Sequence, residues 1–350
     1  MSFQRSFTLN LASQTIQCPA PLLHSSSGNP PGLVSRDANF PNSYLLHLSF
    51  SHIWDKLQDV ETNMSLSQFY SHSVPVLVSP CDITSNDADA AYDSYISLQT
   101  PAGRLKCTPE LFTKFINRWK PDFAILPADD VNMVSQKRAK TALNRTRKWT
   151  LECVENRKSE TLLFLPIDHV IGSKLDSDDV MKSSNVGVSL NHYDLLSTPL
   201  SDVSNFLQSN FQSIPRHATC LGHPLEILEL ISAGFDLISV SFHVLCANQH
   251  LALTFLDQSF STPFIKVEDP SFLLDSTPIS STCTCLCCRQ YSRQYINHLL
   301  KTHEMLGESL LLVHNSFVIV SFFDLIREHV ANNSFDSFKQ KMIDRINKKC

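Results

Sequence analysis

From about residue 100, stretches in which apolar residues recur at helical spacing alternate with short stretches that are apolar throughout. The first kind predicts amphipathic helices, and the second predicts buried strands. Two of the helices have recognisable N-terminal signals. Thr108, followed by Pro109, is expected to cap one helix, and Pro224 is expected in the first turn of the other. Gly234 is expected to end the helix that begins at Pro224. The predicted elements are a helix from Thr108 with Leu111, Phe115 and Ile116 inward, a strand at 122–126, a helix at 135–156 with Ala139, Leu143, Thr146 and Trp149 inward, a strand at 161–167, a helix from Pro224 with Ile227, Leu228 and Ile231 inward, and a strand at 235–240.

Repeated strand-then-helix units predict a parallel sheet with crossover helices. A closed (β/α)8 barrel suits a chain of 350 residues, although the same periodicity fits an open doubly wound sheet. Near the N-terminus, Phe7, Leu9 and Leu11 alternate with polar residues, which predicts early strands. Residues 1–36 contain no acid and are rich in serine, so a transit peptide is the alternative for this segment.

Composition narrows the class of protein. Hydrophobic residues make up 43% of the chain and charged residues 18%, which is typical of a globular domain and not of a disordered one. The longest apolar stretch, Ser309–Ile326, is interrupted by His314 and Asn315, so we expect no transmembrane segment. A net charge of −5 means that any contact with nucleic acid must be local. The candidate for such a contact is a run of basic residues without an acid: Lys137, Arg138, Lys140, Arg145, Arg147 and Lys148. The alternative is that these residues form a solvated helix face.

The densest candidate chemistry lies near the C-terminus. Cys283, Cys285 and Cys288 form a C-x-C-x2-C motif, and His314 can complete a tetrahedron of soft donors. Four such ligands with no open position predict a structural zinc site that binds one Zn²⁺. A reduced cysteine-rich loop and a local disulfide are the alternatives. Cys287 is left unassigned, and eleven cysteines without an apolar signal region favour a reducing compartment.

The residues around this motif resemble the zinc segment of the tRNA-guanine transglycosylase family. The resemblance extends upstream to a helix and strand of that family, and more faintly from about Gln17 to the end of the chain. The matching stretches read C-T-C-L-C-C-R-Q-Y-S-R-Q-Y-I-N-H-L-L-K-T-H-E-M-L-G from Cys283, V-H-N from Val313, G-H-P-L-E-I-L-E-L-I-S-A-G-F-D-L from Gly222, and P-R at Pro215.

This resemblance implies an irregular TIM barrel with a zinc-binding lobe inserted near its C-terminal end. The barrel body is then expected over residues 1–270, and the zinc lobe with the C-terminal helices over 271–350. A helix at 294–306 is expected to pack the lobe on the barrel. His314 is expected just before Asn315, which would cap the next helix.

The catalytic centre of the family is incomplete in this chain. Catalytic members attack the ribose with an aspartate three residues after the aspartate of the motif matched here by Gly234-Phe235-Asp236; this chain has Ser239. A serine needs an adjacent base, and we find no histidine spaced to activate it. Glycines that admit a base are also missing, and the whole chain has only 8. The altered segments are Cys81–Ser94 in place of D-S-G-G-F-Q, Asp168-His169-Val170-Ile171 in place of a G-G pair, and Phe242-His243-Val244 in place of P-T-R.

Two acids of the family pattern remain. Asp129 aligns with a base-recognising aspartate, although a solvated loop acid or a helix cap is the plainer interpretation. For Asp236, the plainer interpretation is a buried acid with a backbone partner.

The resemblance therefore implies a non-catalytic subunit that forms a heterodimer with a catalytic paralogue. Such a complex replaces guanine by queuine at the wobble position of tRNAs with a GUN anticodon, and this subunit would support assembly and tRNA binding. The implied location is cytoplasmic, including the periphery of the mitochondrial outer membrane. The alternatives are an active transglycosylase that uses Asp236 or Asp129, and a zinc-stabilised binding module unrelated to base exchange.

Overall fold

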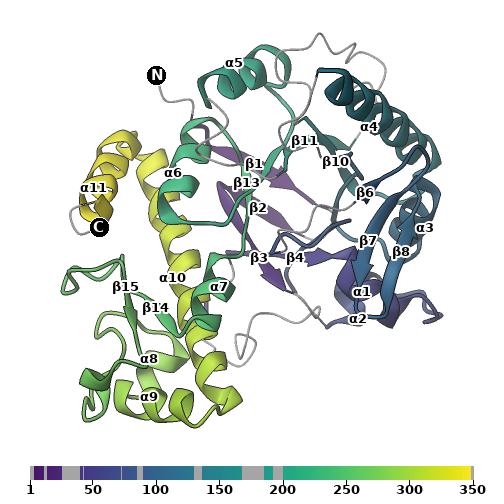
Figure 1. The fold of residues 1–350 in the computed structure, drawn as a ribbon. Helices are drawn as coiled ribbons and strands as arrows, with labels where there is room; N and C mark the ends of the chain where they lie inside the picture. The colour runs from purple at the N-terminus through teal and green to yellow at the C-terminus, as the bar shows by residue number, and fades with distance from the viewer. Residues whose placement is uncertain are drawn as a thin grey trace.

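The computed structural model describes residues 4–11, 14–25, 40–41, 43–71, 73–84, 90–129, 136–167, 185–191 and 200–347. Eight parallel strands form a closed barrel, in which the last strand pairs with the first through Leu237 and Ala20 (Figure 1). The predicted (β/α)8 barrel is confirmed, and the open doubly wound sheet is wrong. In chain order the barrel strands are β3 (Ala20–Ser25), β4 (Leu45–Ser49), β5 (Val76–Ser79), β9 (Phe123–Ile125), β10 (Leu162–Pro166), β11 (Val186–Leu190), β12 (Arg216–Thr219) and β13 (Leu237–Val240).

Crossover helices surround the barrel, and two of them begin and end as the sequence predicts. The Thr108 hydroxyl accepts a hydrogen bond from the Leu111 backbone N–H at 3.1 Å, and Gly234 follows its helix with φ +93°. The helices are α1 (Phe50–Leu57), α2 (Leu66–Phe69), α3 (Pro109–Trp119), α4 (Gln136–Asn156), α5 (Leu200–Asn210), α6 (Pro224–Ser232) and α7 (Phe242–Asn248).

The predicted inward faces of α3 and α4 are confirmed at Phe115, Ile116, Thr146 and Trp149, and they differ at other positions. In α3, Phe112 and Trp119 are buried, whereas Leu111 is half-buried. In α4, Ala142 is buried and Ala139 is exposed. Both helices carry apolar residues on adjacent rows, so spacing alone does not decide which row faces the barrel.

Inside the barrel, the first layer of side chains is apolar. It includes Phe123 and Phe164, whose ring centroids lie 5.9 Å apart. A hairpin of β1 (Phe7–Asn10) and β2 (Thr15–Cys18) packs its buried Leu9 and Ile16 against this layer. Early strands are therefore confirmed, and they close the N-terminal end of the barrel.

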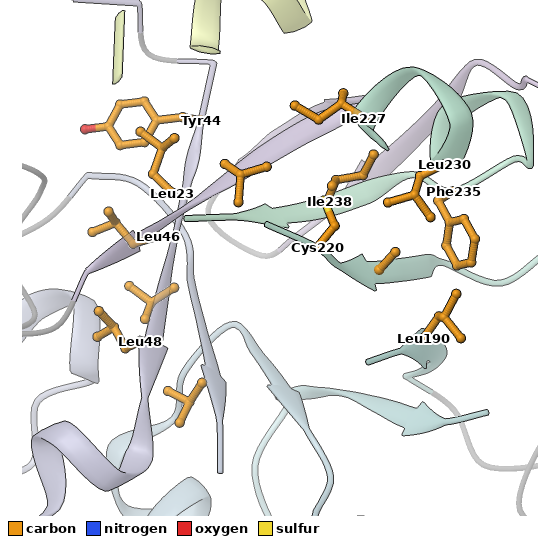
Figure 2. Close-up of a cluster of buried hydrophobic side chains, with 14 of the residues drawn as sticks. Leu23, Tyr44, Leu46, Leu48, Leu190, Cys220, Ile227, Leu230, Phe235 and Ile238 are labelled. Atoms are coloured by element: carbon orange, nitrogen blue, oxygen red, sulfur yellow. The ribbon is translucent and has the colours of Figure 1, made fainter. Parts of the chain in front are cut away.

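A larger apolar layer separates the strands from the helices. Figure 2 shows part of it, where Leu23, Leu46 and Ile238 from the strands lie in the same layer as Ile227 and Leu230 of α6. A three-stranded antiparallel sheet precedes α3 and contacts α1; its strands are β6 (Ala90–Ala91), β7 (Ile96–Thr100) and β8 (Gly103–Cys107).

The cysteine-bearing lobe lies beside the barrel, and the long helix α10 (Met305–Ala331) joins the two (Figure 1). Leu310 and Leu311 pack in the lobe, whereas Phe322 and Ile326 pack in the barrel core. The remaining elements are the hairpin β14 (Leu251–Leu253) and β15 (Phe264–Lys266), the 3-10 helix η2 (Pro270–Phe272), α8 (Leu286–Gln290), α9 (Arg293–Lys301) and α11 (Phe335–Asn347).

Two expectations about this region are wrong. The helix expected at 294–306 ends at Lys301, His303 adopts φ +55°, and α10 then begins. His314 does not precede a cap, because it and Asn315 lie inside α10. By length and composition alone, α10 could cross a membrane, with a mean hydropathy of 1.8. Of its most apolar window, 67% is buried in the fold, as in the core helix of a globular protein.

The division at residue 270 stays a prediction. Ala247, Ala252 and Val267, which precede that boundary, share one apolar cluster with the cysteines of the lobe.

Candidate functional site

Four candidate metal ligands converge at the junction of the lobe and α10. Cys283 and Cys285 precede α8, Cys288 lies within it, and His314 reaches them from α10. The Nδ1 atom of His314 lies 3.7, 3.6 and 3.3 Å from the sulfurs of Cys283, Cys285 and Cys288, respectively. Zn–S bonds of about 2.3 Å and a Zn–N bond of about 2.0 Å at tetrahedral angles place sulfur and nitrogen about 3.6 Å apart. The cluster could therefore hold one metal ion.

The surroundings orient these ligands. His314 Nε2 lies 2.9 Å from the Leu253 carbonyl, which leaves Nδ1 free of a proton and directed at the sulfurs. The next residue, Asn315, accepts a hydrogen bond from the Leu253 backbone N–H and donates one to the Leu251 carbonyl. These bonds explain how two polar residues sit in the middle of an apolar helix: both are used to attach β14.

The other cysteines do not complete a different arrangement. Cys287 is fully buried among apolar side chains and is not one of the four converging ligands. Every cysteine in the part of the chain that the structure describes is free, which excludes a disulfide within the motif.

The position of the family's nucleophile is part of a buried hydrogen-bond network. Ser239 Oγ lies 2.6 Å from His47 Nδ1 and 2.8 Å from His217 Nε2. His47 Nε2 contacts Ser79 Oγ at 2.7 Å, and His217 Nδ1 contacts Ser189 Oγ at 2.8 Å. The expectation that no histidine could reach Ser239 is therefore wrong. β4, β12 and β13 all point these residues into the barrel, on a polar layer above the apolar one.

The direction of these hydrogen bonds follows from one fixed end. Ser79 donates to the Cys81 carbonyl at 2.8 Å, so it accepts from His47 Nε2–H. His47 Nδ1 then accepts from the Ser239 hydroxyl, which itself accepts from His217 Nε2–H. Both imidazoles are neutral in this arrangement. With His217 Nε2 protonated and the ring neutral, its Nδ1 is an acceptor, so the single Ser189 hydroxyl hydrogen is shared between His217 Nδ1 at 2.8 Å and Asn191 Oδ1 at 2.7 Å.

Burial keeps these groups neutral and inaccessible. It lowers the pKa of His217 to about 3 and holds the pKa of His47 well below its usual value. Ser239, His47 and His217 each have 0% of their surface exposed. A hydroxyl bonded to a neutral imidazole resembles part of a nucleophilic dyad, but both nitrogens of each ring contact serine hydroxyls and not a carboxylate, and the Ser239 oxygen is fully buried. At the carboxyl ends of β5, β9 and β12 a cavity of about 30 Å³ remains, lined by residues that include Ser79, Ile125 and Thr219. Ligand sites are typically about 300–1,000 Å³.

Asp129 is neither a solvated loop acid nor a helix cap. Its buried carboxylate accepts hydrogen bonds from Arg138 at 2.7 and 2.6 Å and from Arg145 at 2.6 Å, both on α4. Burial by itself raises the pKa of Asp129, but the hydrogen bonds from the two guanidinium groups outweigh it and lower that pKa. The acid is thus internally paired.

Asp236 has the backbone partner that was expected. It accepts a hydrogen bond from the Arg216 backbone N–H at 2.8 Å and pairs with the guanidinium of Arg5. Asp236 is 1% exposed, and its two contacts attach the N-terminal segment to the start of β12.

The basic run divides into two groups on α4. Arg138 and Arg145 point to Asp129, and Arg145 also pairs with Asp93. The other four bases are exposed: Lys137, Lys140, Arg147 and Lys148. The segment expected to replace the family's G-G pair, 168–171, lies outside the described residues.

Comparison with known proteins agrees with this architecture. The family model described as "Queuine tRNA-ribosyltransferase" matches residues 2–348. Three similar relatives are each named "Queuine tRNA-ribosyltransferase accessory subunit 2". The Drosophila persimilis protein is 29% identical over 75% of this chain and 67% of its own length. The proteins of Drosophila grimshawi and Anopheles gambiae are each 27% identical, over 85% and 95% of this chain and 78% and 84% of their own lengths. The chain belongs to the queuine tRNA-ribosyltransferase family, the tRNA-guanine transglycosylases.

Proposed function

We propose that this chain is the non-catalytic subunit of a heterodimeric queuine tRNA-ribosyltransferase. The catalytic paralogue would exchange guanine for queuine at the wobble position of GUN-anticodon tRNAs in the cytoplasm. The observation that carries this proposal is Ser239, which stands at the nucleophile position and is enclosed between His47 and His217. Base exchange needs a carboxylate that can reach the ribose, and a fully buried hydroxyl cannot serve.

The ion pairs of Asp129 support the same proposal. In catalytic relatives the matching acid is expected to face the base, which requires a free carboxylate. Here Arg138 and Arg145 occupy both of its oxygens. Two requirements for base exchange are therefore unmet by separate side chains.

Zinc is the ion that fits the lobe best. Three thiolates and one imidazole form a closed tetrahedral shell, which suits Zn²⁺ in a structural role and leaves no position for a substrate. When bound, zinc would cross-link α8 to α10 and so attach the lobe to the barrel.

The zinc assignment has a direct test. Elemental analysis should find about one zinc per chain. Cys288→Ser should lose the metal and soluble protein, whereas Cys287→Ser should retain both because Cys287 is outside the cluster. Full solubility with less than about half an equivalent of zinc would contradict the assignment.

The lobe also carries the proposed surface for the partner. Leu274 is 88% and Met305 85% exposed, and Leu273 and Tyr295 are also exposed on this lobe. Exposed large apolar side chains on one part of a protein mark interaction surfaces. We assign these four residues to the contact with the catalytic paralogue. Arg293 is unsuitable for testing this surface, because it pairs with Asp275 and donates to the Ile279 carbonyl.

Contact with tRNA is assigned to α4. Lys137, Lys140, Arg147 and Lys148 are the exposed bases of this helix, and in the sequence the whole run from Lys137 contains no acid. Because the protein carries a net charge of −5, a local basic face is needed to attract phosphate.

Reconstitution tests the proposal as a whole. An equimolar mixture with the catalytic paralogue should elute as one species at micromolar concentration, and Leu274→Asp with Met305→Asp should separate it into monomers. The isolated chain should incorporate no labelled guanine into tRNA. Incorporation by the isolated chain, or separate elution of the unmodified proteins, would overturn the assignment.

A further inference from the structure

A second group of metal-ligating side chains lies at the other end of the barrel interior from the N-terminal hairpin. His24 is at the end of β3, His52 is in α1, and Asp82 follows β5. One ligand atom from each lies within 4.8 Å of the other two. His52 Nε2 is 3.2 Å from Asp82 Oδ2, and His24 Nε2 is 3.7 Å from Asp82 Oδ1. Three segments that are far apart in sequence thus bring two imidazoles and a carboxylate to one point.

These distances suit an ion held between the three groups. Metal–nitrogen and metal–oxygen bonds of about 2.0–2.2 Å separate adjacent ligand atoms by about 3.0–3.5 Å in octahedral or tetrahedral geometry. The distance from His52 to Asp82 falls in that range, and the distance from His24 is slightly above it. A small rotation of the Asp82 carboxylate would equalise them.

Without an ion, His24 is poorly satisfied. Its ring is 2% exposed, and among the described residues its Nδ1 atom has no hydrogen-bond partner. Its Nε2 atom faces Asp82 at 3.7 Å, which is too long for a hydrogen bond. Buried polar atoms are nearly always paired, so an Nε2 atom aimed at a carboxylate from this distance indicates an occupant between them; that occupant would pair Nε2 and leave Nδ1 as it is.

The charge of Asp82 points to a cation. Within the described ranges, its ion-pair contacts are with His24 and His52, and no lysine or arginine reaches it. Asp129, another acid near the mouth of the barrel, is neutralised by two arginines instead. The Asp82 carboxylate is also held in place, because Thr84 donates to it from its backbone N–H and its hydroxyl at 2.9 Å. Metal-ligating carboxylates are commonly oriented by such bonds.

We propose that His24, His52 and Asp82 bind one divalent first-row transition-metal ion at the mouth of the barrel. Two imidazoles and a carboxylate select ions such as Zn²⁺, Co²⁺ and Fe²⁺ over Mg²⁺ and Ca²⁺, which prefer oxygen ligands. Three protein ligands leave positions for water or another ligand. The ion cross-links β3, α1 and the segment after β5. This site is separate from the cysteine cluster and does not depend on the proposed pairing with a catalytic paralogue.

Cobalt titration tests the site in the full chain. Protein that holds one equivalent of zinc in the cysteine cluster is titrated with Co²⁺ and followed by visible absorbance and elemental analysis. We expect one further equivalent to bind without release of zinc. Its spectrum should show weak ligand-field bands and lack thiolate charge-transfer bands, because no sulfur belongs to the site.

Three variants decide the ligands. His52→Ala and Asp82→Asn should each weaken Co²⁺ binding at least about a hundredfold, whereas His298→Ala, which removes an exposed histidine of α9, should leave it unchanged. His52 is partly exposed, so His52→Ala gives a folded test protein if the Asp82 variant fails to fold. No binding beyond the zinc equivalent at about 1 mM Co²⁺, or equal binding by His52→Ala and the unmodified chain, would overturn the proposal.

Discussion

Removing the hydroxyl of Ser239 should destabilise the fold without affecting base exchange. In Ser239→Ala, His47 Nδ1 loses its donor and His217 Nε2 loses its acceptor, and both atoms are buried beyond the reach of solvent. Each unsatisfied buried group costs about 1–3 kcal/mol, so the free energy of unfolding should fall by about 2–6 kcal/mol. That is a large fraction of the roughly 5–15 kcal/mol by which native domains are stable.

Urea unfolding of the zinc-loaded chain measures this loss. With a denaturant dependence of about 3 kcal/mol/M for a chain of this size, the midpoint should fall by roughly 1 M. Ser316→Ala is the matched control, because this serine of α10 is fully buried and its hydroxyl has no partner among the described residues. Its stability should change by less than about 0.5 kcal/mol.

Turnover supplies the second readout. The reconstituted heterodimer that contains Ser239→Ala should keep kcat within about threefold, since deletion of a true nucleophile costs orders of magnitude. A midpoint that matches the Ser316→Ala control would refute the hydrogen-bond argument. A loss of roughly a thousandfold in kcat with normal stability would show that Ser239 takes part in the chemistry.

Three further predictions concern charged and titratable side chains. Replacing both Arg138 and Arg145 by methionine leaves the Asp129 carboxylate buried without a cation, so unfolding experiments should show a loss of about 3–5 kcal/mol that Asp129→Leu partly restores. Because the pKa of His217 is about 3 in the fold and about 6.5 in an unfolded chain, the unfolded state binds a proton that the fold excludes. This histidine should therefore contribute a loss of about 1.4 kcal/mol per pH unit below pH 6.5, in addition to the losses from His24, His47 and His243, whose pKa values are also lowered by burial; His217→Gln should remove its share of the slope in urea titrations at pH 5–6.5. Replacing the four exposed bases of α4 by alanine should raise the KM for tRNA and make its salt dependence shallower, and an unchanged KM would place the RNA elsewhere.

The parts of the structure that depend on local sequence were predictable. The barrel follows from repeated periodicity, and the α3 cap follows from Thr108 and Pro109. Cys283, Cys285 and Cys288 fall within one short segment, so their convergence needs no knowledge of the fold. What could not be predicted depends on strand register over long separations.

His47 and Ser239 illustrate that limit. They are 192 residues apart, and they meet only because β4 and β13 both direct the residue in question into the barrel. A signal was present at His47, which interrupts the apolar strand Leu45–Ser49 at a position whose neighbours point outward; His217 stands between Arg216 and Ala218 in a mixed strand and gives no such signal. Two-residue alternation assigns such a histidine to the barrel interior, but its partner remains unknown until the strands are aligned.

If this chain is non-catalytic, as proposed, the interior of its barrel indicates that the change involved more than one substitution. The polar positions of a nucleoside-binding centre persist, yet each now has a partner inside the protein: Ser239 has two histidines, and Asp129 has two arginines. A buried polar group that loses its ligand must gain a new partner or cost stability, so these contacts replace what a bound base would supply. Placing an aspartate at position 239 would add a buried charge beside neutral histidines while Asp129 stayed paired. The two networks stabilise the fold because their polar groups are paired within the protein, and the same pairing leaves Ser239 and Asp129 fully buried.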